Sequence, residues 1–363
     1  MKRVAALDLL RGLAAFSVAI PHYLTLNATD WRDADILAVA AVEVFFVLSG
    51  FVLAPQILTQ VVGRPVGNLR VFLVRRWMRT IPPYLVALFG ISLATGQLQT
   101  VDFVRYAFYV QNLFYQANAN DYYPVAWSLS VEEWFYVTFA PLVFITAKLY
   151  RSDAWNTAVF VGIFLVLVVM VARASFGDYG HWDAEVRRVV VFRIDSILFG
   201  ILLYVAMSKF DGSRDTKPSI RWAAPIFFVC SAAAAAVTYL AMTGNLLSQQ
   251  AFPYVTAAMG VSAVALAHKA EFLFMKRKRL ADFCRYLGGI SYSVYLFHII
   301  LIMLLKPKLQ NLDLIWQLLA YLSCLVVLCS IFWIYFEKSV LAARPKYTTN
   351  TVAEGQAGLV SHV

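Results

Sequence analysis

Charge is scarce in this sequence, and so is cysteine. Only 14% of the 363 residues are Asp, Glu, Lys or Arg, whereas soluble domains carry about 25% of them. An ordinary soluble protein is therefore excluded. The four cysteines include no C-x-x-C pair, which argues against a disulfide framework or a cysteine-bound metal, and we expect no metal site.

Long apolar runs are what the sequence does contain. Apolar residues make up 61% of the chain, and they gather in blocks of roughly 20, long enough to cross a bilayer. We expect an all-α, polytopic membrane bundle of about ten transmembrane helices. This domain would cover residues 1–340, and residues 341–363 would form a polar, disordered cytoplasmic tail. The predicted spans are 7–26, 37–57, 80–98, 128–149, 155–173, 188–206, 222–242, 250–268, 289–306 and 313–337.

Basic residues are unevenly distributed along the chain. The formal net charge is +10, and Lys and Arg concentrate in loops on one side of the predicted membrane. By the positive-inside rule those loops, and both termini, face the cytoplasm. The positive charge then reflects topology, so we expect no nucleic-acid partner. Asp8 and Arg11 interrupt the first apolar run, which favours a retained helix over a cleaved signal peptide.

The first span carries three ionisable side chains, Asp8, Arg11 and His22. Spacing along an α-helix places Arg11 and His22 on one face, about 16 Å apart along the axis, and Asp8 lies close enough to Arg11 to pair with it. Ionisable groups inside spans usually line a cavity or pathway. The alternative is an arginine that snorkels to the helix end and a histidine at the membrane interface.

Five further segments place ionisable or polar groups in or beside spans. They hold Glu43 with Ser49 and Gly50; Arg75, Arg76 and Arg79; Ser128, Glu132 and Glu133; Arg193 and Asp195; and Ser291, Tyr292 and His298. Burying so many of these groups is costly unless they are paired or wet, so we expect a polar tunnel through the bundle. The alternatives are a protonated Glu43, an N-cap at Ser128 and a bundle histidine at position 298 that is satisfied by its neighbours.

The arginine group has the most specific chemistry. On a helix, Arg75, Arg76 and Arg79 would share one face, and the planar guanidinium fork suits phosphate oxygens. Ordinary positive-inside flanking is the alternative for each arginine taken singly. Arg193 and Asp195 are two residues apart, so we expect them to pair with different helices.

In this order and spacing, the motifs resemble the acyltransferase-3 family of membrane acyltransferases over nearly all of residues 4–340. The resemblance is carried by Arg11 and His22, FFVLSGF at 45–51, RRWMR at 75–79, WSLSVEEWFY at 127–136, RIDSILFG at 193–200, LGGISYSVYLFH at 287–298 and YFEKSV at 335–340. It implies an O-acyltransferase of the bacterial inner membrane. Such an enzyme moves an acyl group, usually acetyl, from cytoplasmic acyl-CoA to a hydroxyl of an extracytoplasmic or lipid-linked glycan, as in exopolysaccharide or lipopolysaccharide.

The resemblance also implies roles for single residues. His22 would take the proton of the acceptor hydroxyl, and Glu132 or Glu133 would orient its ring. Ser291 or Tyr292 would stabilise the oxyanion. An acyl-enzyme relay is the alternative to direct transfer, and acyl-CoA is expected as a substrate, with no permanently bound cofactor. The acyl-CoA site would comprise Arg11, Arg75, Arg76, Arg79, Arg193, Ser291 and Tyr292, and the tunnel would be lined by Asp8, Glu43, Ser128, Asp195 and His298.

The acceptor site is expected in the aromatic loop 99–127. Tyr122, Tyr123 and Trp127 offer faces for sugar rings, and Asn112 offers an amide for hydroxyls; an interfacial aromatic belt is the alternative. Two other functions stay open, a transporter or flippase for a lipid-linked saccharide and a non-catalytic partner of a polysaccharide synthase. Beyond its substrates and membrane lipids, the chain could associate as a homodimer or with polysaccharide-synthesis machinery.

Overall fold

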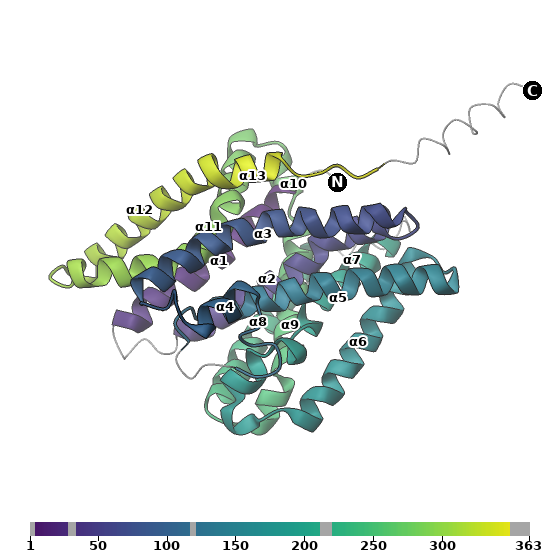
Figure 1. Cartoon of the computed structure of the whole chain (residues 1–363), viewed down its shortest axis with the longest axis horizontal. Coiled ribbons are helices and arrows are strands. Elements are labelled where there is room, and N and C mark those ends of the chain that lie inside the picture. Colours follow the sequence, from purple (N-terminus) through teal and green to yellow (C-terminus); the bar gives the residue numbers. More distant parts are fainter. Residues whose placement is uncertain (1–3, 28–33, 117–120, 211–219, 349–363) are drawn as a thin grey trace, which may run out of the picture.

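The computed structural model describes residues 4–27, 34–116, 121–210 and 220–348, and every regular element in these ranges is a helix (Figure 1). Within them, nine helices are long and apolar enough to cross a membrane. The predicted class, an all-α multi-pass membrane protein, is confirmed. The nine are α1 (Ala5–Asn27), α2 (Asp35–Gln56), α5 (Ala126–Tyr150), α6 (Ala154–Phe176), α7 (Asp195–Phe210), α8 (Ile220–Met242), α9 (Leu246–Lys269), α11 (Lys278–Leu309) and α12 (Leu314–Phe332).

Most of the predicted span 80–98 lies in α3 (Val66–Ala94), which begins earlier and is more polar than expected. The sequence predicts a basic loop over 58–79, but α2 continues into a π-helical turn, Ile57–Val61, and α3 begins soon after it. The arginine cluster therefore lies on a helix, which fixes the directions of its side chains relative to one another. The other elements are α4 (Val101–Ala107), α10 (Phe272–Met275), α13 (Lys338–Ala342), the π turns Asp183–Arg187 and Trp333–Glu337, and the 3₁₀ turns Tyr179–His181 and Val190–Phe192.

Helix α1 packs against α2 and α11, α2 packs against α7, and glycine residues permit close approaches in these contacts. A Cβ atom at Gly288 of α11 would lie 2.7 Å from the Cβ atom of Asp8. At Gly50 of α2 it would lie 2.0 Å from the carbonyl oxygen of Ile197 on α7. Small residues let helix backbones approach one another in membranes. The Ser49-Gly50 pair permits either a close helix approach or a local break. The structure has the close approach at Gly50, and Ser49 lines a cavity.

Two buried ion pairs tie the middle of the bundle together. Arg193, with 1% of its surface exposed, pairs with Glu43 of α2. Asp195, at the start of α7, accepts a hydrogen bond from Arg173 of α6 at 2.8 Å. The prediction that Arg193 and Asp195 pair with different helices is confirmed. Pairing offsets the cost of burying these charges, so their presence in spans does not require a tunnel.

The predicted span 188–206 is only partly helical. Helix α7 begins at Asp195, and residues 179–193 form short 3₁₀ and π turns. The backbone N–H groups of Val190 and Val191 donate to the carbonyls of Asn112 and Leu113 at 2.9 and 3.2 Å. This irregular segment is therefore held against the residues that follow α4.

The chain beyond α13 lies against α3 (Figure 1). The backbone of Thr348 exchanges hydrogen bonds with the side chain of Asn68, which lies near the start of α3. The predicted disordered tail thus has a described part, residues 343–348, with fixed contacts. Residues 349–363 lie outside the described ranges.

Candidate functional site

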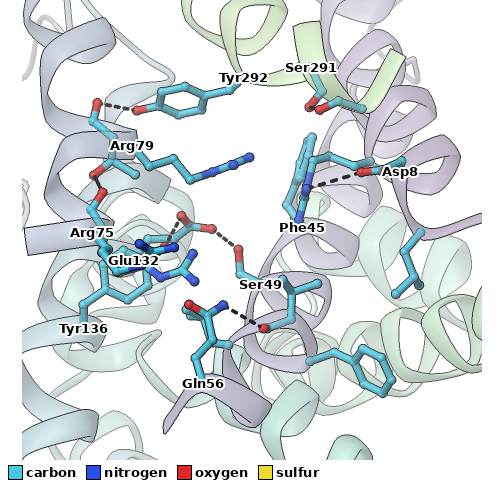
Figure 2. Close-up of a pocket in the computed structure, with 18 of the residues that line it drawn as sticks. Asp8, Phe45, Ser49, Gln56, Arg75, Arg79, Glu132, Tyr136, Ser291 and Tyr292 are labelled. Carbon is cyan, nitrogen blue, oxygen red and sulfur yellow. Dashed lines mark hydrogen bonds and ion pairs between the residues drawn. The ribbon is translucent and has the colours of Figure 1, made fainter. Parts of the chain in front are cut away.

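Two cavities of similar size adjoin one another inside the bundle. The first, which we call the arginine cavity, has a volume of about 790 Å³ and is bounded by α1, α2, α3, α5, α11 and the residues after α13 (Figure 2). Its polar and charged lining comprises Asp8, Arg11, Ser49, Gln56, Thr59, Gln60, Arg75, Arg76, Arg79, Thr80, Ser128, Glu132, Tyr136, Ser291, Tyr292, Tyr295, Glu337, Arg344 and Tyr347.

Four guanidinium groups dominate the charge of this cavity. One helical turn of α3 supplies Arg75, Arg76 and Arg79, and Arg344 adds the fourth. Among the described residues, none of the four has a carboxylate within 4.0 Å. The Nε atoms of Arg75 and Arg76 are buried without a hydrogen-bond partner. Such a cluster attracts anions and is well suited to bind several phosphate oxygens.

Asp8 of α1 lies across the cavity from Arg75 and Arg79 (Figure 2). Arg11 of the same helix also lines the cavity. Arg11 Nη1 lies 3.9 Å from Asp8 Oδ1. The predicted pairing of these two side chains is therefore confirmed. Together with the cluster on α3, Arg11 gives the cavity cationic groups on two sides.

The two acids of α5 have different surroundings, and neither contacts His22. Glu132 lines the arginine cavity and accepts hydrogen bonds from Ser49 Oγ at 2.5 Å and from the Tyr136 hydroxyl at 2.8 Å. Glu133 is buried and does not line the cavity. In the described structure no hydrogen bond or ion pair joins either acid to His22, whose Nδ1 instead meets another histidine. The expectation that Glu132 or Glu133 orients His22 is wrong.

Ser291 and Tyr292 line the arginine cavity, but their hydroxyl protons are engaged. Ser291 Oγ donates to the carbonyl of Gly288 at 2.9 Å, and the Tyr292 hydroxyl donates to the carbonyl of Thr80 at 2.9 Å. In this arrangement neither hydroxyl can also donate to an oxyanion. They shape the cavity from α11, and the expected oxyanion role does not fit this geometry.

The second cavity has a volume of about 800 Å³, and we call it the histidine cavity. It lies between α1, α2, the start of α5, the turns at 180–188, α9 and α11. Its polar and aromatic lining comprises His22, Thr25, Asp35, Trp127, His181, Trp182, Asp183, Arg187, Arg188, Gln249 and Tyr295.

His22 meets His298 of α11 at the edge of the histidine cavity. His22 Nδ1 lies 2.9 Å from His298 Nε2, and the two rings are stacked with their centroids 5.2 Å apart. His298 is fully buried, and its Nδ1 lies 2.8 Å from the carbonyl oxygen of Tyr295. The sequence predicts that His298 lines a tunnel, but it lines neither cavity and reaches the site only through His22.

Tyr295 and Val42 line both cavities and so form the wall between them. The Tyr295 hydroxyl lies 2.6 Å from Ser128 Oγ and 3.2 Å from the carbonyl oxygen of Val125. The sequence predicts one continuous passage from the arginines to His22. The structure instead has two cavities with a common wall, held in place by hydrogen bonds from α11 to α5.

Charges on the histidine cavity are balanced. Arg188 pairs with Asp183 at 2.6 Å and with Asp121 at 3.6 Å, and Arg187 also pairs with Asp183. Burial raises the pKa of Asp183, but the guanidinium groups of Arg187 and Arg188 outweigh it and lower the pKa to about 2. The Arg187 guanidinium lies 5.1 Å from the centre of the Trp127 ring. Sequence reasoning missed these residues, although adjacent arginines on the side expected to be poor in basic residues were a usable signal.

Of the four predicted acceptor residues, only Trp127 lines the histidine cavity. Tyr123 is fully buried, and its hydroxyl donates to the carbonyl of Leu296. Tyr122 lies against Tyr106 and accepts a hydrogen bond from Ser92. Asn112 is fully buried; its Nδ2 donates to the carbonyls of Trp127 and Arg188 and so joins α5 to the irregular segment. These three residues support the site without lining it.

Three other predicted site residues also lie away from the cavities. Arg193, Glu43 and Asp195 line neither of them, because each is consumed in a buried ion pair. Contrary to the prediction, Arg193 therefore does not lie with the arginines of the arginine cavity. Ser128, by contrast, lines the arginine cavity as expected.

The described chain is thus a helical membrane bundle with a cationic cavity next to a cavity that His22 lines. The chain matches the acyltransferase-3 model, described as an acyltransferase domain, over residues 4–336. It belongs to that family. No solved structure matches the chain significantly.

Relatives named as O-acetyltransferases match most of the chain. It is 23% identical over 337 residues to the peptidoglycan O-acetyltransferase OatA of Listeria monocytogenes, covering 85% of this chain and 51% of that protein. It is 27% identical over 313 residues to the O-acetyltransferase OatA of Staphylococcus aureus, covering 80% of this chain and 49% of that protein. The chain thus spans about half the length of these relatives.

Proposed function

We propose that the protein is a membrane O-acetyltransferase that moves an acetyl group from acyl-CoA in the arginine cavity to a saccharide hydroxyl in the histidine cavity. The observation that carries the proposal is the shared wall at Tyr295 and Val42, which alone separates a polycationic cavity from the cavity that His22 lines. Membership of the acyltransferase family and the names of the OatA relatives support the reaction type.

The arginine cavity suits the donor. Coenzyme A carries a pyrophosphate and a phosphate on its ribose, so it brings several anionic oxygens to one end of a long, thin molecule. Arg75, Arg76 and Arg79 offer guanidinium groups without carboxylate partners in the described chain. We infer that this end faces the cytoplasm, where acyl-CoA is found, because basic residues concentrate in the loops on its side of the chain.

The hydrogen bonds of the two histidines support Nε2 of His22 as the base. Carbonyl oxygens only accept, so His298 Nδ1, which lies between the carbonyls of Val294 and Tyr295, must carry a proton. A neutral His298 then has a lone pair on Nε2, which accepts from His22 Nδ1–H at 2.9 Å. The lone pair of His22 is left on Nε2. His298 thus has the orienting role that the sequence assigns to a glutamate, without adding negative charge.

In the proposed reaction, His22 carries the proton from the acceptor hydroxyl to the departing thiolate. The saccharide oxygen attacks the thioester carbonyl carbon while His22 Nε2 takes the hydroxyl proton, and His22 becomes an imidazolium that still donates through Nδ1 to His298. The carbon–sulfur bond then breaks. The imidazolium returns its proton to the departing thiolate, so free coenzyme A and an acetyl ester are the products.

The histidine cavity suits a hydroxyl-rich acceptor. Its arginines are already paired with aspartates, so it carries no excess of positive charge that would select an anion. Ion-paired side chains still offer lone pairs and N–H groups to hydroxyls, and Trp127 and Trp182 offer flat apolar faces. A saccharide that reaches the cavity from the side opposite the arginines fits this lining. The name of the Listeria relative makes a cell-wall glycan the first acceptor to try.

A radiochemical assay tests the proposal. Purified protein in lipid nanodiscs would be incubated with acetyl-labelled acetyl-CoA and solubilised glycan chains, and labelled glycan and free coenzyme A would be measured. We expect the wild type to make both, and His22→Ala to lose about 10²- to 10⁴-fold of the rate, the usual contribution of a general base.

His268→Ala is the matched control, because His268 is a histidine of α9 that lines neither cavity. It should keep the wild-type rate. Glycan that stays unlabelled while it crosses the membrane of sealed vesicles would replace the proposal by a saccharide transporter.

A further inference from the structure

The described part of the C-terminal segment, Arg344 to Thr348, crosses the rim of the arginine cavity. Arg75 Nη1 donates to the carbonyl of Pro345 at 2.6 Å, and the Arg75 guanidinium lies 5.2 Å from the centre of the Tyr347 ring. The segment lies beyond residue 336, where the match to the family model ends. Its contacts are therefore a feature of this chain outside the part that the family model covers.

One side chain clasps the segment to α3. Asn68 is fully buried. Its Oδ1 accepts from the backbone N–H of Thr348 at 3.0 Å and from the Thr348 hydroxyl at 2.6 Å, and its Nδ2 donates to the carbonyl of Thr348 at 3.3 Å. Both backbone groups of Thr348 are thus paired. Since Asn68 does not line the cavity, these bonds hold the segment without offering anything to a ligand.

Two residues of the segment line the arginine cavity, Arg344 and Tyr347. Arg344 is half-buried, and its Nε donates to the carbonyl of Leu341 at 3.0 Å. Burial, together with the charges of Arg75, Arg79 and Arg76, lowers the pKa of Arg344 to about 10. A guanidinium placed among three others is unfavourable on its own, so the arrangement calls for an anion that all four can share.

Buried polar atoms without hydrogen-bond partners also indicate that a ligand binds in this cavity. The Tyr347 hydroxyl is buried without a hydrogen-bond partner, as are the Nε atoms of Arg75 and Arg76. A buried donor without an acceptor is costly. Three such groups around one cavity indicate that a ligand with several acceptors completes the site.

We propose that the C-terminal segment is part of the donor site, in which Arg344 binds a phosphate of acyl-CoA and the Tyr347 hydroxyl donates to its nucleotide. This inference rests on the proposed function and deepens it. The clasp at Asn68 keeps the segment in its binding position. The segment is then a fixed wall of the site, as opposed to a plug that must leave before the donor enters.

Calorimetric titration of the purified full-length protein with coenzyme A tests this. Arg344→Gln removes one guanidinium from the cavity and should weaken coenzyme A binding about tenfold, the value of one charge-assisted hydrogen bond. Lys346→Gln is the matched control, because Lys346 is exposed in the same segment and does not line the cavity. It removes the same charge and should change the affinity less than about twofold. Tyr347→Phe should weaken binding a few-fold.

A third variant separates a wall from a plug. Asn68→Ala loosens the clasp and, if the segment belongs to the site, should weaken coenzyme A binding as Arg344→Gln does. Tighter binding or faster transfer in Asn68→Ala would overturn the proposal, because it would mean that the segment blocks the donor. Thermal unfolding of each variant would confirm that it is folded.

The two proposals fail in different ways. If wild type binds coenzyme A, Arg75→Gln weakens it and Arg344→Gln matches Lys346→Gln, the C-terminal segment is not in the site but the donor cavity stands. If wild type binds no coenzyme A at all, the donor assignment itself is wrong, and this inference falls with it.

Discussion

The two cavities handle charge in opposite ways. In the arginine cavity, four guanidinium groups have no carboxylate within ion-pair distance among the described residues. In the histidine cavity, Arg187 and Arg188 are both paired with aspartates. An unbalanced set of cations gains most from an anionic ligand, whereas a balanced set gains most from a neutral ligand that can use both signs. Under the proposed function, this difference is the reason to place the donor in the arginine cavity and the acceptor in the histidine cavity.

The largest effect should come from His22 and His298, whose contact involves none of the charged groups just compared. In His298→Ala, His22 Nδ1–H loses its acceptor, so the tautomer with a lone pair on Nε2 is no longer favoured. We expect a fall in kcat of about 10²-fold, since fixing the tautomer of a catalytic histidine can contribute as much as about 10⁴-fold. KM for both substrates should change little. His298→Gln offers an amide oxygen at a similar distance and should restore part of the rate.

A different result would separate positioning from packing. His298 is fully buried. If its role were purely structural, both variants would lose kcat and thermal stability together. Rescue of kcat by Gln without a matching recovery of stability would favour positioning. Equal loss of rate and stability in both variants would contradict the role of His298 in holding the tautomer.

Charge removal on the two sides should act on different substrates. The double variant Arg75→Gln and Arg79→Gln should raise KM for acetyl-CoA about 10- to 100-fold, because each lost charge-assisted hydrogen bond costs about 1.5–3 kcal/mol. Its KM for acceptor should stay near the wild-type value. Arg188→Gln should raise KM for the acceptor and leave KM for acetyl-CoA near the wild-type value. If both variants raise the same KM, the division of substrates between the cavities is wrong.

The sequence predicts the membrane-spanning helices and the arginine cluster better than the lining of the histidine cavity. Nine of the ten predicted spans correspond to helices long and apolar enough to cross a membrane in the described chain, because span length and hydropathy are local properties. The arginines on α3 are likewise visible as a local cluster. Predicting that Asn68 holds Thr348, 280 positions away, requires the packed helices. Polar composition alone therefore suggests disorder at the chain end.

An ionisable group within a predicted span was the least reliable guide to which residues line the cavities. Arg193 and Glu43 have the same sequence signature as Arg11 and His22, namely a charged or titratable group in an apolar run. The first two form a buried ion pair, whereas the last two line cavities. Only the register between helices decides which outcome occurs. Helix register also distinguishes His298 from Glu132, because His298 contacts His22 whereas Glu132 accepts a hydrogen bond from Ser49.

The wall between the cavities should have a smaller effect. In the proposed reaction the Tyr295 ring turns aside only when the acceptor hydroxyl meets the thioester. Tyr295→Ala leaves the two cavities joined at all times, so water from the histidine cavity can reach the thioester. We expect acetyl-CoA hydrolysis without acceptor to rise a few-fold relative to transfer, since a closed site normally excludes this side reaction. Tyr295→Phe keeps the ring and removes only the hydrogen bonds to Ser128 and Val125. It should show less hydrolysis than the alanine variant, and equal hydrolysis in the two would argue against a wall made by the ring.

The smallest effect concerns the ion pairs of the histidine cavity as the pH falls. Arg187 and Arg188 hold the pKa of Asp183 at about 2, against burial and below its ordinary value of 3.8. The stabilisation from this charge is fully present above that ordinary value and is lost only as the pH falls through about 2. Burial raises the pKa of Asp121, so that carboxylate takes up a proton first. The protection of the backbone amides of residues 183–188 against hydrogen exchange, corrected for the intrinsic exchange rate at pH 7 and at pH 4, should therefore change little in wild type and in Asp121→Asn, but should fall in Asp183→Asn at both pH values. Equal protection in Asp183→Asn and wild type would mean that the pairing of these charges does not hold the acceptor side together.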